Sequence, residues 1–568
     1  MSISAESETA SLAIRRLHPY WYSRATVTMV AKPQGGPGVE FNLADLFESV
    51  VATVPEADAL VAGDRRLTYR ALDDRANRLA NHLAAAGVGR DDFVGLHLSN
   101  GTEYIEAMLA CFKLRAVPVN INWRYVSAEL RYLYEDAGLV GLIVHRRFGE
   151  AAGGALDAIA DARVVLDVDD GTDAPPIGED YEAALASSSV EPFFGPRSAD
   201  DLYCVYTGGT TGMPKGVLWR HEDIFFAAMG GGDPMQFGNV IAEPGELADR
   251  VLSPGLVELP VPPLMHASAQ WLAFHTFFGG GKLVLSPGGT FDPAAIWRLV
   301  ADEGVNILVI VGDAMARPLL DHLDEFGGDD ELSSLMALGS GGAILSPSTK
   351  SRLRGRFKDL VIVDAFGASE TGQLGGKPPE ADPFGAPRLT ADEHTTVFDD
   401  EFRPVQPGSG VIGLLARGGR VPLRYHGDPA KTAATFVEVD GVRWSLPGDE
   451  ATIASDGTIE LLGRSAQCIN TGGEKVYAEE VETVLLGHPD IEDVVVVGVP
   501  DDRWGHRVVA VASERAGRSV SLDDLRRHGQ ADLASYKLPR DLVVVDEIVR
   551  QPSGKPDYRW AVGVAEEN

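Results

Sequence analysis

Short apolar runs alternate with amphipathic helical stretches along most of this chain, and this alternation restricts the fold more than any other feature. Residues 68–87 predict a helix, because Thr68 can cap it, leucine and alanine recur at helical spacing, and Gly87 can end it. Apolar runs typical of buried strands follow at 93–98, 117–121, 164–168, 282–285, 307–311 and 360–364. Repeated alternation of this kind predicts an α/β architecture with a mainly parallel sheet.

The pattern changes after about residue 465. Residues 474–486 predict a helix, 494–499 and 508–512 predict buried strands, and a short helix is expected after Asp523. These elements predict a small α+β unit of ~100 residues behind the large one, with a boundary near 463–470. At the other end, the Pro- and Gly-rich stretch 32–38 closes an N-terminal extension over residues 1–40, which we expect to be poorly ordered.

Composition excludes several functional classes. Lys and Arg number 50 against 83 Asp and Glu, and the net charge of −33 argues against sequence-independent binding of nucleic acid. The three cysteines, Cys111, Cys204 and Cys468, are far apart and odd in number, which excludes a disulfide framework and fits a reducing cytoplasm. No run of 18 apolar residues is present, and no apolar segment follows Arg15 and Arg16. We therefore expect neither a transmembrane helix nor a signal peptide.

The strongest local motif lies at 206–216 and reads Tyr-Thr-Gly-Gly-Thr-Thr-Gly-Met-Pro-Lys-Gly. Glycines allow the backbone to turn tightly with its N–H groups pointing inward, and threonine and lysine side chains add donors, so the segment suits a polyphosphate. A Walker A loop requires Ser or Thr after its lysine, whereas Gly216 follows Lys215 and Pro214 precedes it. The loop is therefore the wrong kind for a kinase or ATPase that releases ADP.

This segment resembles the nucleotide loop of the adenylate-forming superfamily, which includes acyl-CoA synthetases, luciferases and peptide-synthetase adenylation domains. Further matches follow in order at 339–343, 365–372, 447–449, 463–464, 472–476 and 552–556, and the resemblance extends from about residue 42 to residue 560. Their order and spacing together are highly specific. The local sequence at 207–223, 469–477 and 554–560 is similar to bacterial acyl-CoA synthetases that act on long-chain fatty acids or steroid side-chain carboxylates.

The resemblance implies an α/β fold with a large N-terminal adenylate-forming domain of mixed sheets and helices at 41–463. A hinge at 464–468 would connect it to a small mobile α+β C-terminal domain at 469–568. This chain has Gln467 where the family's hinge usually has Asp or Lys, so a charged pivot is not carried over. It also has Gly208 where the phosphate loop commonly has Ser, which removes one hydroxyl donor and leaves the backbone donors in place.

The resemblance also implies roles for individual residues. ATP would be bound by Thr207, Gly208, Gly209, Thr210, Thr211, Gly212, Lys215, Gly341, Gly342, Ala343, Phe366, Gly367, Ser369, Asp449, Arg464 and Lys555. Of these, Thr207, Lys215 and Lys555 would be catalytic. Glu370 would bind Mg²⁺ and His266 would contact the acyl substrate. CoA would contact Gly472, Gly473 and Lys475.

Physical chemistry supports some of these roles and leaves alternatives for others. A carboxylate at the end of a strand, as at Glu370, can hold Mg²⁺ beside phosphates. Phe366 either stacks on adenine or belongs to the core, and Asp449 either accepts hydrogen bonds from ribose or forms an ordinary turn. His266 is equally consistent with a core or surface histidine. Eleven of the 50 basic residues are lysines, and those at 215, 475 and 555 lie in glycine-containing motifs, where a compact ammonium can stabilise migrating charge.

The predicted function is that of an ATP-dependent acid–CoA ligase in the cytoplasm. A carboxylate would attack the α-phosphate of ATP, with Mg²⁺ as cofactor, to give acyl-AMP and pyrophosphate, and the thiol of CoA would then displace AMP. The expected partners are a small-molecule carboxylic acid, ATP and CoA, without nucleic acid, and the oligomeric state stays open, a homodimer included.

Three alternatives to this function remain. The first is an adenylate-forming enzyme with another acceptor, such as a carrier protein or oxygen. The second is an aryl-acid CoA ligase, and the third is a non-enzymatic acyl- or nucleotide-binding protein. No carrier domain follows before Asn568, which favours free CoA.

Overall fold

The computed structural model describes residues 28–29 and 40–568, except for 208–213, 237, 287, 289–290, 344, 375–388, 465–467, 472–473, 502–504, 531, 534 and 552–553. At residues 28, 29, 329, 330, 364, 464, 468, 470, 474, 475 and 505 it describes the main chain alone. The expected extension at 1–40 therefore lies outside the described residues, apart from Glu40 and strand β1 (Thr28–Met29), which pairs with β11 (Leu252–Ser253).

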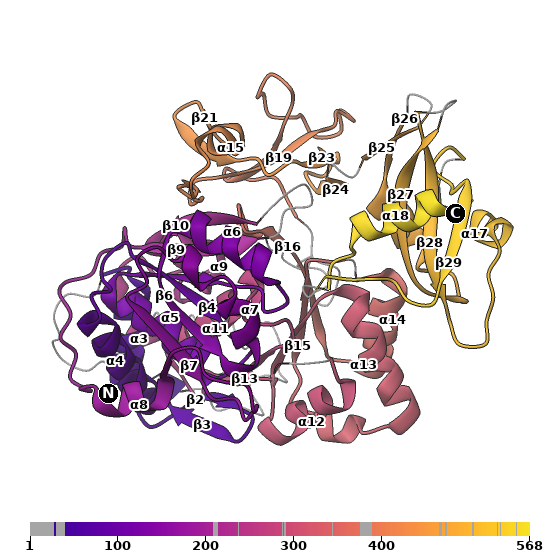
Figure 1. The fold of residues 1–568 in the computed structure, drawn as a ribbon. Helices are drawn as coiled ribbons and strands as arrows, with labels where there is room; N and C mark the ends of the chain where they lie inside the picture. The colour runs from indigo at the N-terminus through magenta and orange to yellow at the C-terminus, as the bar shows by residue number, and fades with distance from the viewer. Residues whose placement is uncertain are drawn as a thin grey trace.

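Two mainly parallel sheets build the N-terminal domain (Figure 1). The first contains, in spatial order, β5 (Val117–Asn120), β4 (Phe93–His97), β6 (Leu139–His145), β7 (Val164–Val168) and β8 (Glu179–Asp180), all parallel. The second contains β17 (Gly372–Leu374), β16 (Val361–Ala368), β15 (Ala337–Gly341), β14 (Ile307–Ile310), β12 (Val257–Pro260), β13 (Lys282–Leu285), β2 (Asp58–Ala62) and β3 (Arg65–Thr68). Its interior pairs are parallel and its two end pairs are antiparallel. The predicted α/β architecture is confirmed.

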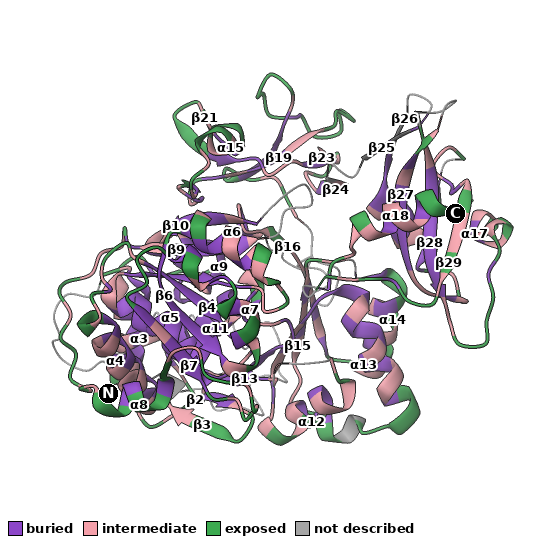
Figure 2. Cartoon of the chain, in the orientation of Figure 1, coloured by how far each residue is buried: buried purple, intermediate pink, exposed green. Residues whose placement is uncertain are grey.

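Helices pack between the two sheets and on their outer faces. One large apolar cluster joins both sheets to α3 (Leu43–Thr53), α4 (Tyr69–Ala85), α5 (Thr102–Leu114), α8 (Tyr181–Ser187), α9 (His221–Ala228), α10 (Leu247–Arg250) and α11 (Ala267–Phe278). A second cluster packs α6 (Ser127–Ala137) and α7 (Gly149–Gly153) on the first sheet. A third packs α12 (Pro293–Glu303), α13 (Gly312–Phe326) and α14 (Pro347–Arg356) on the second. Figure 2 shows this layering, with α5 and α11 buried and the outer side of α12 exposed.

Two antiparallel sheets complete this domain. The smaller one contains β20 (Arg424–Tyr425), β10 (Lys215–Arg220) and β9 (Leu202–Thr207). The larger one contains β21 (Phe436–Val439), β22 (Val442–Ser445), β19 (Gly413–Gly418), β23 (Asp449–Ile453) and β24 (Ile459–Arg464), with β18 (Thr395–Phe398) on β19. Helix α15 (Pro429–Thr435) lies between β20 and β21 in the chain. Short 3₁₀ helices occur at Arg146–Phe148, Leu156–Ala158, Gly230–Gly232, Pro244–Glu246 and Asp329–Leu332.

The C-terminal domain is a separate α+β unit. Its sheet contains β26 (Glu474–Tyr477), β25 (Cys468–Thr471), β28 (Gly505–Glu514) and β27 (Ile491–Asp501), with β29 (Asp541–Val545) parallel to β28. Helices α16 (Ala478–Leu485) and α17 (Leu522–Gly529) pack on one face, and α18 (Tyr558–Glu567) packs on the other. Because side chains alternate along β27, its valines serve both faces: Val494 and Val496 face α16, whereas Val495 and Val497 face α18.

Most predicted elements are present, with one correction. Helix α4 begins where Thr68 was expected to cap it, and the Thr68 hydroxyl accepts a hydrogen bond from the main-chain N–H of Ala71 at 3.2 Å. The predicted helix at 474–486 is wrong over its first four residues, which form β26. They pair residue for residue with β25 in an antiparallel hairpin, and helix α16 starts only at Ala478. Residues 474–477 form a strand because β25 supplies their hydrogen-bond partners, and a helical pattern of apolar residues gives no information about such a partner.

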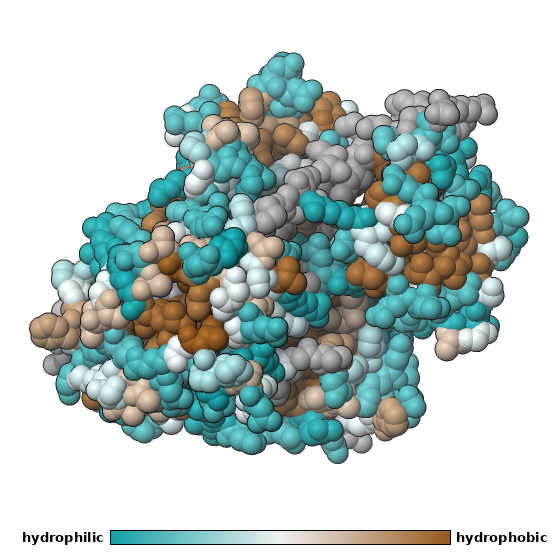
Figure 3. All heavy atoms as spheres, in the orientation of Figure 1, coloured by the Kyte–Doolittle hydropathy of each residue, from teal (hydrophilic) through white to brown (hydrophobic). Residues whose placement is uncertain are grey.

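Cys111 and Cys204 are buried free thiols. Within the residues that the structure describes, no helix is both long and apolar enough to cross a membrane. Hydrophilic side chains cover much of the face shown in Figure 3, interrupted by smaller hydrophobic areas.

A buried carboxyl makes the C-terminal domain sensitive to pH. Glu482 of α16 is 3% exposed, accepts from the main-chain N–H of Val496 at 2.8 Å, and lies 3.2 Å from the hydroxyl of Tyr558. Burial raises the pKa of Glu482 to about 8, and the charge of Glu479 adds to the shift, whereas the two hydrogen bonds and the charge of Arg550 oppose it. In the unfolded chain the same carboxyl ionises near its ordinary pKa of 4.5.

Stability of the C-terminal domain should therefore fall as pH rises from about 4.5 to about 8, because the unfolded state loses this proton first. Glu482→Gln removes the ionisation and keeps an oxygen for Val496. We expect the variant to be more stable than the parent at pH 8 by on the order of a few kcal/mol, and nearly equal to it at pH 5. Thermal unfolding at both pH values measures this, with the exposed Glu566→Gln as the matched control. An equal shift at both pH values would show that Glu482 does not titrate as described.

Candidate active site

The predicted phosphate loop is held at both ends by one strand pair. Thr207 ends β9 and Lys215 begins β10, and the two residues are direct partners in the antiparallel register. Direct partners lie about 5 Å apart, so the two ends of the loop meet. The predicted nucleotide-binding residues Gly208, Gly209, Thr210, Thr211 and Gly212 lie outside the described residues.

A buried asparagine joins this strand pair to the segment that carries His266. Asn120, at the end of β5, accepts from the main-chain N–H of Tyr206 at 2.7 Å and donates to its carbonyl at 2.8 Å. The same side-chain amide donates to the carbonyl of Met265 at 2.7 Å. Asn120 is 6% exposed, so losing these bonds would leave buried polar groups unsatisfied. His266 follows Met265 and is the N-cap residue of α11, which puts the predicted acyl-contacting residue beside the stem of the phosphate loop.

Asn120 was not among the site residues predicted from the sequence. The available signal was a polar residue at the end of a buried parallel strand, the edge at which ligands bind in α/β sheets.

Lys215 is paired with a carboxylate in this structure. Its Nζ lies 2.5 Å from Asp428 Oδ2, and Asp428 Oδ1 accepts from the main-chain N–H of Lys431 at 2.9 Å, which caps α15. The hydrogen bond from Lys215 lowers the pKa of Asp428. Both side chains are about one-third exposed, so the pair is weak enough for a phosphate group to compete for the ammonium. Asp428 lies 213 residues from Lys215, and no motif indicated it.

Hydrogen bonds connect Glu370 and its neighbour Ser369 to the sheet that contains β10, the strand after the phosphate loop. The hydroxyl of Tyr425, on the neighbouring strand β20, donates to Glu370 Oε1 at 2.8 Å. The buried Trp219 of β10 donates its Nε1–H to the carbonyl of Ser369 at 2.9 Å. Together these two bonds attach the turn between β16 and β17 to the sheet that carries Lys215, which brings the predicted metal ligand and the predicted phosphate-binding lysine into one region.

The carboxylate of Glu370 fits Mg²⁺. This ion takes oxygen ligands, usually one or two carboxylates together with substrate phosphates. A carboxylate has about four acceptor positions, so the hydrogen bond from Tyr425 leaves room for a metal ion. Among the described residues, no group of three or more His, Cys, Asp or Glu side chains is arranged to hold a metal ion. An ion at Glu370 would therefore be shared with the phosphates of the substrate.

The predicted nucleotide-binding residues Gly341 and Gly342 lie at the end of β15, beside the neighbouring strand β16. Gly341 is opposite Ala365, and a Cβ on Gly341 would lie 2.9 Å from the Ala365 carbonyl oxygen. Gly342 follows with a φ of +83°, which residues with side chains rarely adopt. The two glycines add no side chains of their own at this edge, which allows a ligand to approach the main chain closely.

Ala343 and Phe366, from the same motifs, pack against apolar clusters. Ala343 packs against the cluster under α13 and α14, and Phe366 packs against the cluster that contains Leu374, Val397 and Leu415. For Phe366 this favours the core interpretation over adenine stacking. Gly367, the next residue of β16, pairs with Gln373 of β17.

The predicted ribose residue Asp449 is the first residue of β23 and is 4% exposed, so it does not belong to an ordinary exposed turn. Its direct partner across the strands is Arg464, the last residue of β24, whose side chain lies outside the described atoms. The structure thus brings the two predicted nucleotide residues together through main-chain pairing.

Lys555 of the C-terminal domain lies over Gly342. Its Cε is 3.5 Å from the position that a Cβ on Gly342 would take. The preceding Gly554 has a φ of +78°, and a Cβ there would lie 2.8 Å from the side chain of Val311, at the end of β14. A Cβ at Gly554 would crowd Val311, whereas a Cβ at Gly342 would be in ordinary van der Waals contact with Lys555. The structure therefore places the exposed Lys555 of one domain against Gly342, a predicted nucleotide-binding residue of the other.

The predicted CoA-contacting residues belong to another part of the C-terminal domain. Gly472 and Gly473 lie outside the described residues, and Lys475 is described by its main chain alone, in β26. Figure 1 shows β25 and β26 at the end of this domain that points away from α13 and α14. Strand β26, which contains the main chain of Lys475, thus lies apart from those two helices.

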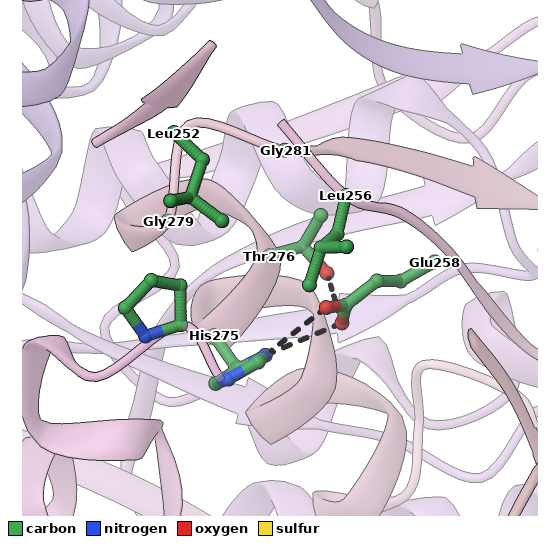
Figure 4. Close-up of a pocket in the computed structure, with 8 residues that line it drawn as sticks. Leu252, Leu256, Glu258, His275, Thr276, Gly279 and Gly281 are labelled. Carbon is green, nitrogen blue, oxygen red and sulfur yellow. Dashed lines mark hydrogen bonds and ion pairs between the residues drawn. The ribbon is translucent and has the colours of Figure 1, made fainter. Parts of the chain in front are cut away.

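The apolar helix α11 is mainly a core element. Phe274, Phe277 and Phe278 are buried in the large cluster between the two sheets. Figure 4 shows the small pocket at the end of this helix, where His275 and Thr276 both contact the carboxylate of Glu258, at 3.3 and 2.8 Å. The pocket is too narrow to hold a water molecule. Packing therefore accounts for the apolar side chains of this helix.

The charge of Glu258 stabilises the protonated form of His275. Burial alone would lower the pKa of His275, but the nearby carboxylate outweighs this effect and raises the pKa above its ordinary value. A buried ion pair of this kind serves the integrity of the core, because removing one partner would leave the other charge uncompensated.

Comparisons with known proteins agree with this arrangement. The chain matches the AMP-binding enzyme family over residues 47–422 and the AMP-binding enzyme C-terminal domain over residues 480–555. A 3-oxocholest-4-en-26-oate–CoA ligase of Rhodococcus rhodochrous is 46% identical over 92% of this chain and 95% of that protein. A medium/long-chain-fatty-acid–CoA/3-oxocholest-4-en-26-oate–CoA ligase of Mycolicibacterium smegmatis is 44% identical over 93% of this chain and 97% of that protein.

A solved structure supports the fold. An anthranilate–CoA ligase in complex with anthranoyl-AMP superimposes with a TM-score of 0.79 at 22% identity, over 94% of this chain and 98% of that one. At this identity the likeness concerns the fold alone. The chain belongs to the AMP-binding enzyme family, and its predicted resemblance to AMP-forming acyl-CoA synthetases is confirmed.

Proposed function

We propose that this protein is an ATP-dependent acid–CoA ligase that acts on long-chain or steroidal carboxylic acids through an acyl-adenylate. The observation that carries the proposal is that Lys555 of the C-terminal domain lies over Gly342 of the N-terminal domain. The N-terminal domain also contains Lys215 and Glu370. This arrangement suits a reaction in which a carboxylate meets the α-phosphate of ATP between opposed positive groups. The buried free thiols of Cys111 and Cys204 fit a cytoplasmic location.

Adenylation in this site depends on positioning and on charge stabilisation. One carboxylate oxygen of the acid attacks the α-phosphorus, the bond to the β-phosphate oxygen breaks, and pyrophosphate leaves with the electron pair. The ammonium of Lys555 would stabilise the negative charge that passes from carboxylate to phosphate, and Lys215 would exchange Asp428 for a phosphate oxygen. Mg²⁺ held by Glu370 would supply charge neutralisation on the phosphates. Thr207 and the loop that follows it would donate hydrogen bonds to the phosphates.

Thioester formation requires a different arrangement of the two domains. The CoA sulfur attacks the acyl carbon, AMP leaves, and the thiol proton passes to solvent or to the departing phosphate. The C-terminal domain would rotate about residues 464–468, which would remove Lys555 from Gly342 and bring Gly472, Gly473 and Lys475 toward the acyl-adenylate. The position of Lys555 over Gly342 corresponds to the adenylation step of this scheme.

The substrate class rests on the relatives. Two proteins that share nearly half of their residues with this chain over almost its full length carry names that specify steroid side-chain or medium- and long-chain acids. Each buried CH₂ group contributes ~0.8 kcal/mol to binding, so a long chain should be favoured over acetate by orders of magnitude in kcat/KM.

A panel of acids tests both activity and substrate class. Acetate, octanoate, palmitate, benzoate and a steroid side-chain acid are each supplied with ATP, Mg²⁺ and CoA, and AMP, ADP, pyrophosphate and thioester are measured. We expect equal amounts of AMP, pyrophosphate and thioester, and the highest kcat/KM with palmitate or the steroid acid. Formation of ADP would exclude the reaction. Preference for acetate or benzoate would refute the substrate class, and acyl-AMP without thioester would indicate another acceptor, such as a carrier protein.

A further inference from the structure

Arg317 joins the two domains at a buried position. It lies on α13 of the N-terminal domain and is 4% exposed. Its guanidinium donates to three main-chain carbonyls of the C-terminal domain: Leu486 at 2.7 Å, Glu492 at 2.5 Å and Ile491 at 3.4 Å. The first carbonyl follows the last turn of α16, where helix carbonyls lack partners within the helix, and the others lie at the start of β27. One side chain thus satisfies acceptors from two elements of the other domain.

The base of this contact is rigid. Arg317 Nε donates to Asp313 Oδ2 at 2.9 Å, one turn earlier on α13, and Asp313 Oδ1 accepts from the main-chain N–H of Ser346 at 2.8 Å. Ser346 is the N-cap residue of α14. Asp313 is also buried. The planar guanidinium is therefore held in one orientation before it meets the C-terminal domain.

The start of β27 also orients the main chain next to Lys555, through Asp493 and Arg550. Asp493, the residue after Glu492, binds Arg550 through both carboxylate oxygens, at 2.6 and 2.8 Å. Arg550 Nη1 donates to the carbonyl of Gly554 at 2.9 Å, and the carbonyl of Lys555 accepts from the main-chain N–H of Gln551 at 2.8 Å. Paired hydrogen bonds between arginine and a carboxylate are geometrically specific, so the loop is oriented relative to the start of β27.

We propose that Arg317 is a positioning residue for adenylation: it fixes the start of β27, and through Asp493 and Arg550 it holds Lys555 over Gly342. The inference rests on the proposed function, because it assigns Arg317 to the half-reaction in which Lys555 acts. Rotation of the C-terminal domain would break the three hydrogen bonds of Arg317 together. The residue therefore favours the adenylation arrangement and contributes nothing to thioester formation.

A double-mutant cycle tests the proposal. Arg317→Ala, Lys555→Ala and the double variant are assayed for acid-dependent pyrophosphate release, and separately for thioester formation from synthetic acyl-AMP and CoA. We expect Arg317→Ala to lower the kcat of adenylation by ~10–10²-fold, because misplacement of a reacting group by about 1 Å costs rates of this order. Thioester formation should stay equal or become faster. In the Lys555→Ala background, Arg317→Ala should change adenylation by less than about twofold, since its effect passes through Lys555.

Control variants separate positioning from folding. Arg352→Ala removes an arginine of the neighbouring helix α14 that binds Asp321 and Asp324 within the N-terminal domain, and it should show no difference between the half-reactions. Arg317→Lys keeps the charge but presents a single nitrogen, so an intermediate loss of adenylation is expected. If Arg317→Ala fails to fold in a thermal melt, Arg550→Gln interrupts the same series of contacts from the other domain and should give the same separation of the half-reactions.

The outcomes are distinct. Equal loss of both half-reactions in a folded Arg317→Ala protein, or a full additional loss in the Lys555→Ala background, would overturn the role of Arg317. If Lys555→Ala separates the half-reactions while Arg317→Ala and Arg550→Gln do not, the inference fails and the proposed function stands. If Lys555→Ala itself shows no separation, the role assigned to Lys555 fails and the role of Arg317 fails with it, whereas the products formed in the acid panel decide the proposed function.

Discussion

Replacing Lys555 by alanine is expected to slow adenylation by ~10²–10³-fold and to leave thioester formation from a supplied acyl-adenylate nearly normal. The side chain of Lys555 lies over Gly342 in the arrangement that suits the first half-reaction, and loss of one preorganised donor to a developing charge has an effect of this size. The measurement supplies the variant with acid plus ATP in one assay and with synthetic acyl-AMP plus CoA in another.

Lys537→Ala is the matched control for Lys555→Ala. It removes another lysine of the C-terminal domain, which binds Glu480 at 2.6 Å, and it should affect neither half-reaction. Equal loss in both assays of Lys555→Ala would mean that the lysine is structural or serves CoA. No loss in either assay would transfer the role at the reacting centre to Lys215 or Lys475.

Glu370→Gln should lower kcat on the order of tenfold or more and move the Mg²⁺ titration to higher concentration, because it removes the charge that would hold the ion while keeping the shape of the side chain. The amide oxygen can still accept from the hydroxyl of Tyr425, now at 2.8 Å from the carboxylate, so the turn should stay in place. Initial rates as a function of Mg²⁺ at saturating ATP measure both effects.

Tyr425→Phe separates the charge of Glu370 from its hydrogen bond. This variant keeps the carboxylate and removes its donor, so we expect a smaller fall in kcat than in Glu370→Gln and a nearly unchanged Mg²⁺ titration. If Glu370→Gln leaves the titration curve where it was, the metal ion is bound elsewhere and the assignment of Glu370 is wrong.

The architecture could be predicted because its signals are local. A buried strand needs a short apolar run and a helix needs apolar residues on one face, so the alternation over the first 370 residues predicts parallel strands from neighbours in the sequence. Their division into two sheets was not predicted, because it depends on which strands pair. The motif at 206–216 and the pair Gly341–Gly342 are equally local signals, because glycine permits main-chain conformations, such as the positive φ of Gly342, that other residues rarely adopt. The helix predicted from residue 474 failed at its start because β25, its hairpin partner, decides the conformation of those residues.

The α/β class, the order of the motifs and the candidate site residues Lys555 and Glu370 could all be predicted from the sequence. Which groups these residues contact is seen only in the folded structure. Lys215 pairs with Asp428 across 213 residues. Arg317 meets carbonyls at positions 169 to 175 residues away, and a main-chain carbonyl looks the same in every sequence, so no residue pattern could indicate that contact. Contacts of this kind depend on how the two domains dock, which is a property of the packed chain and not of any segment within it.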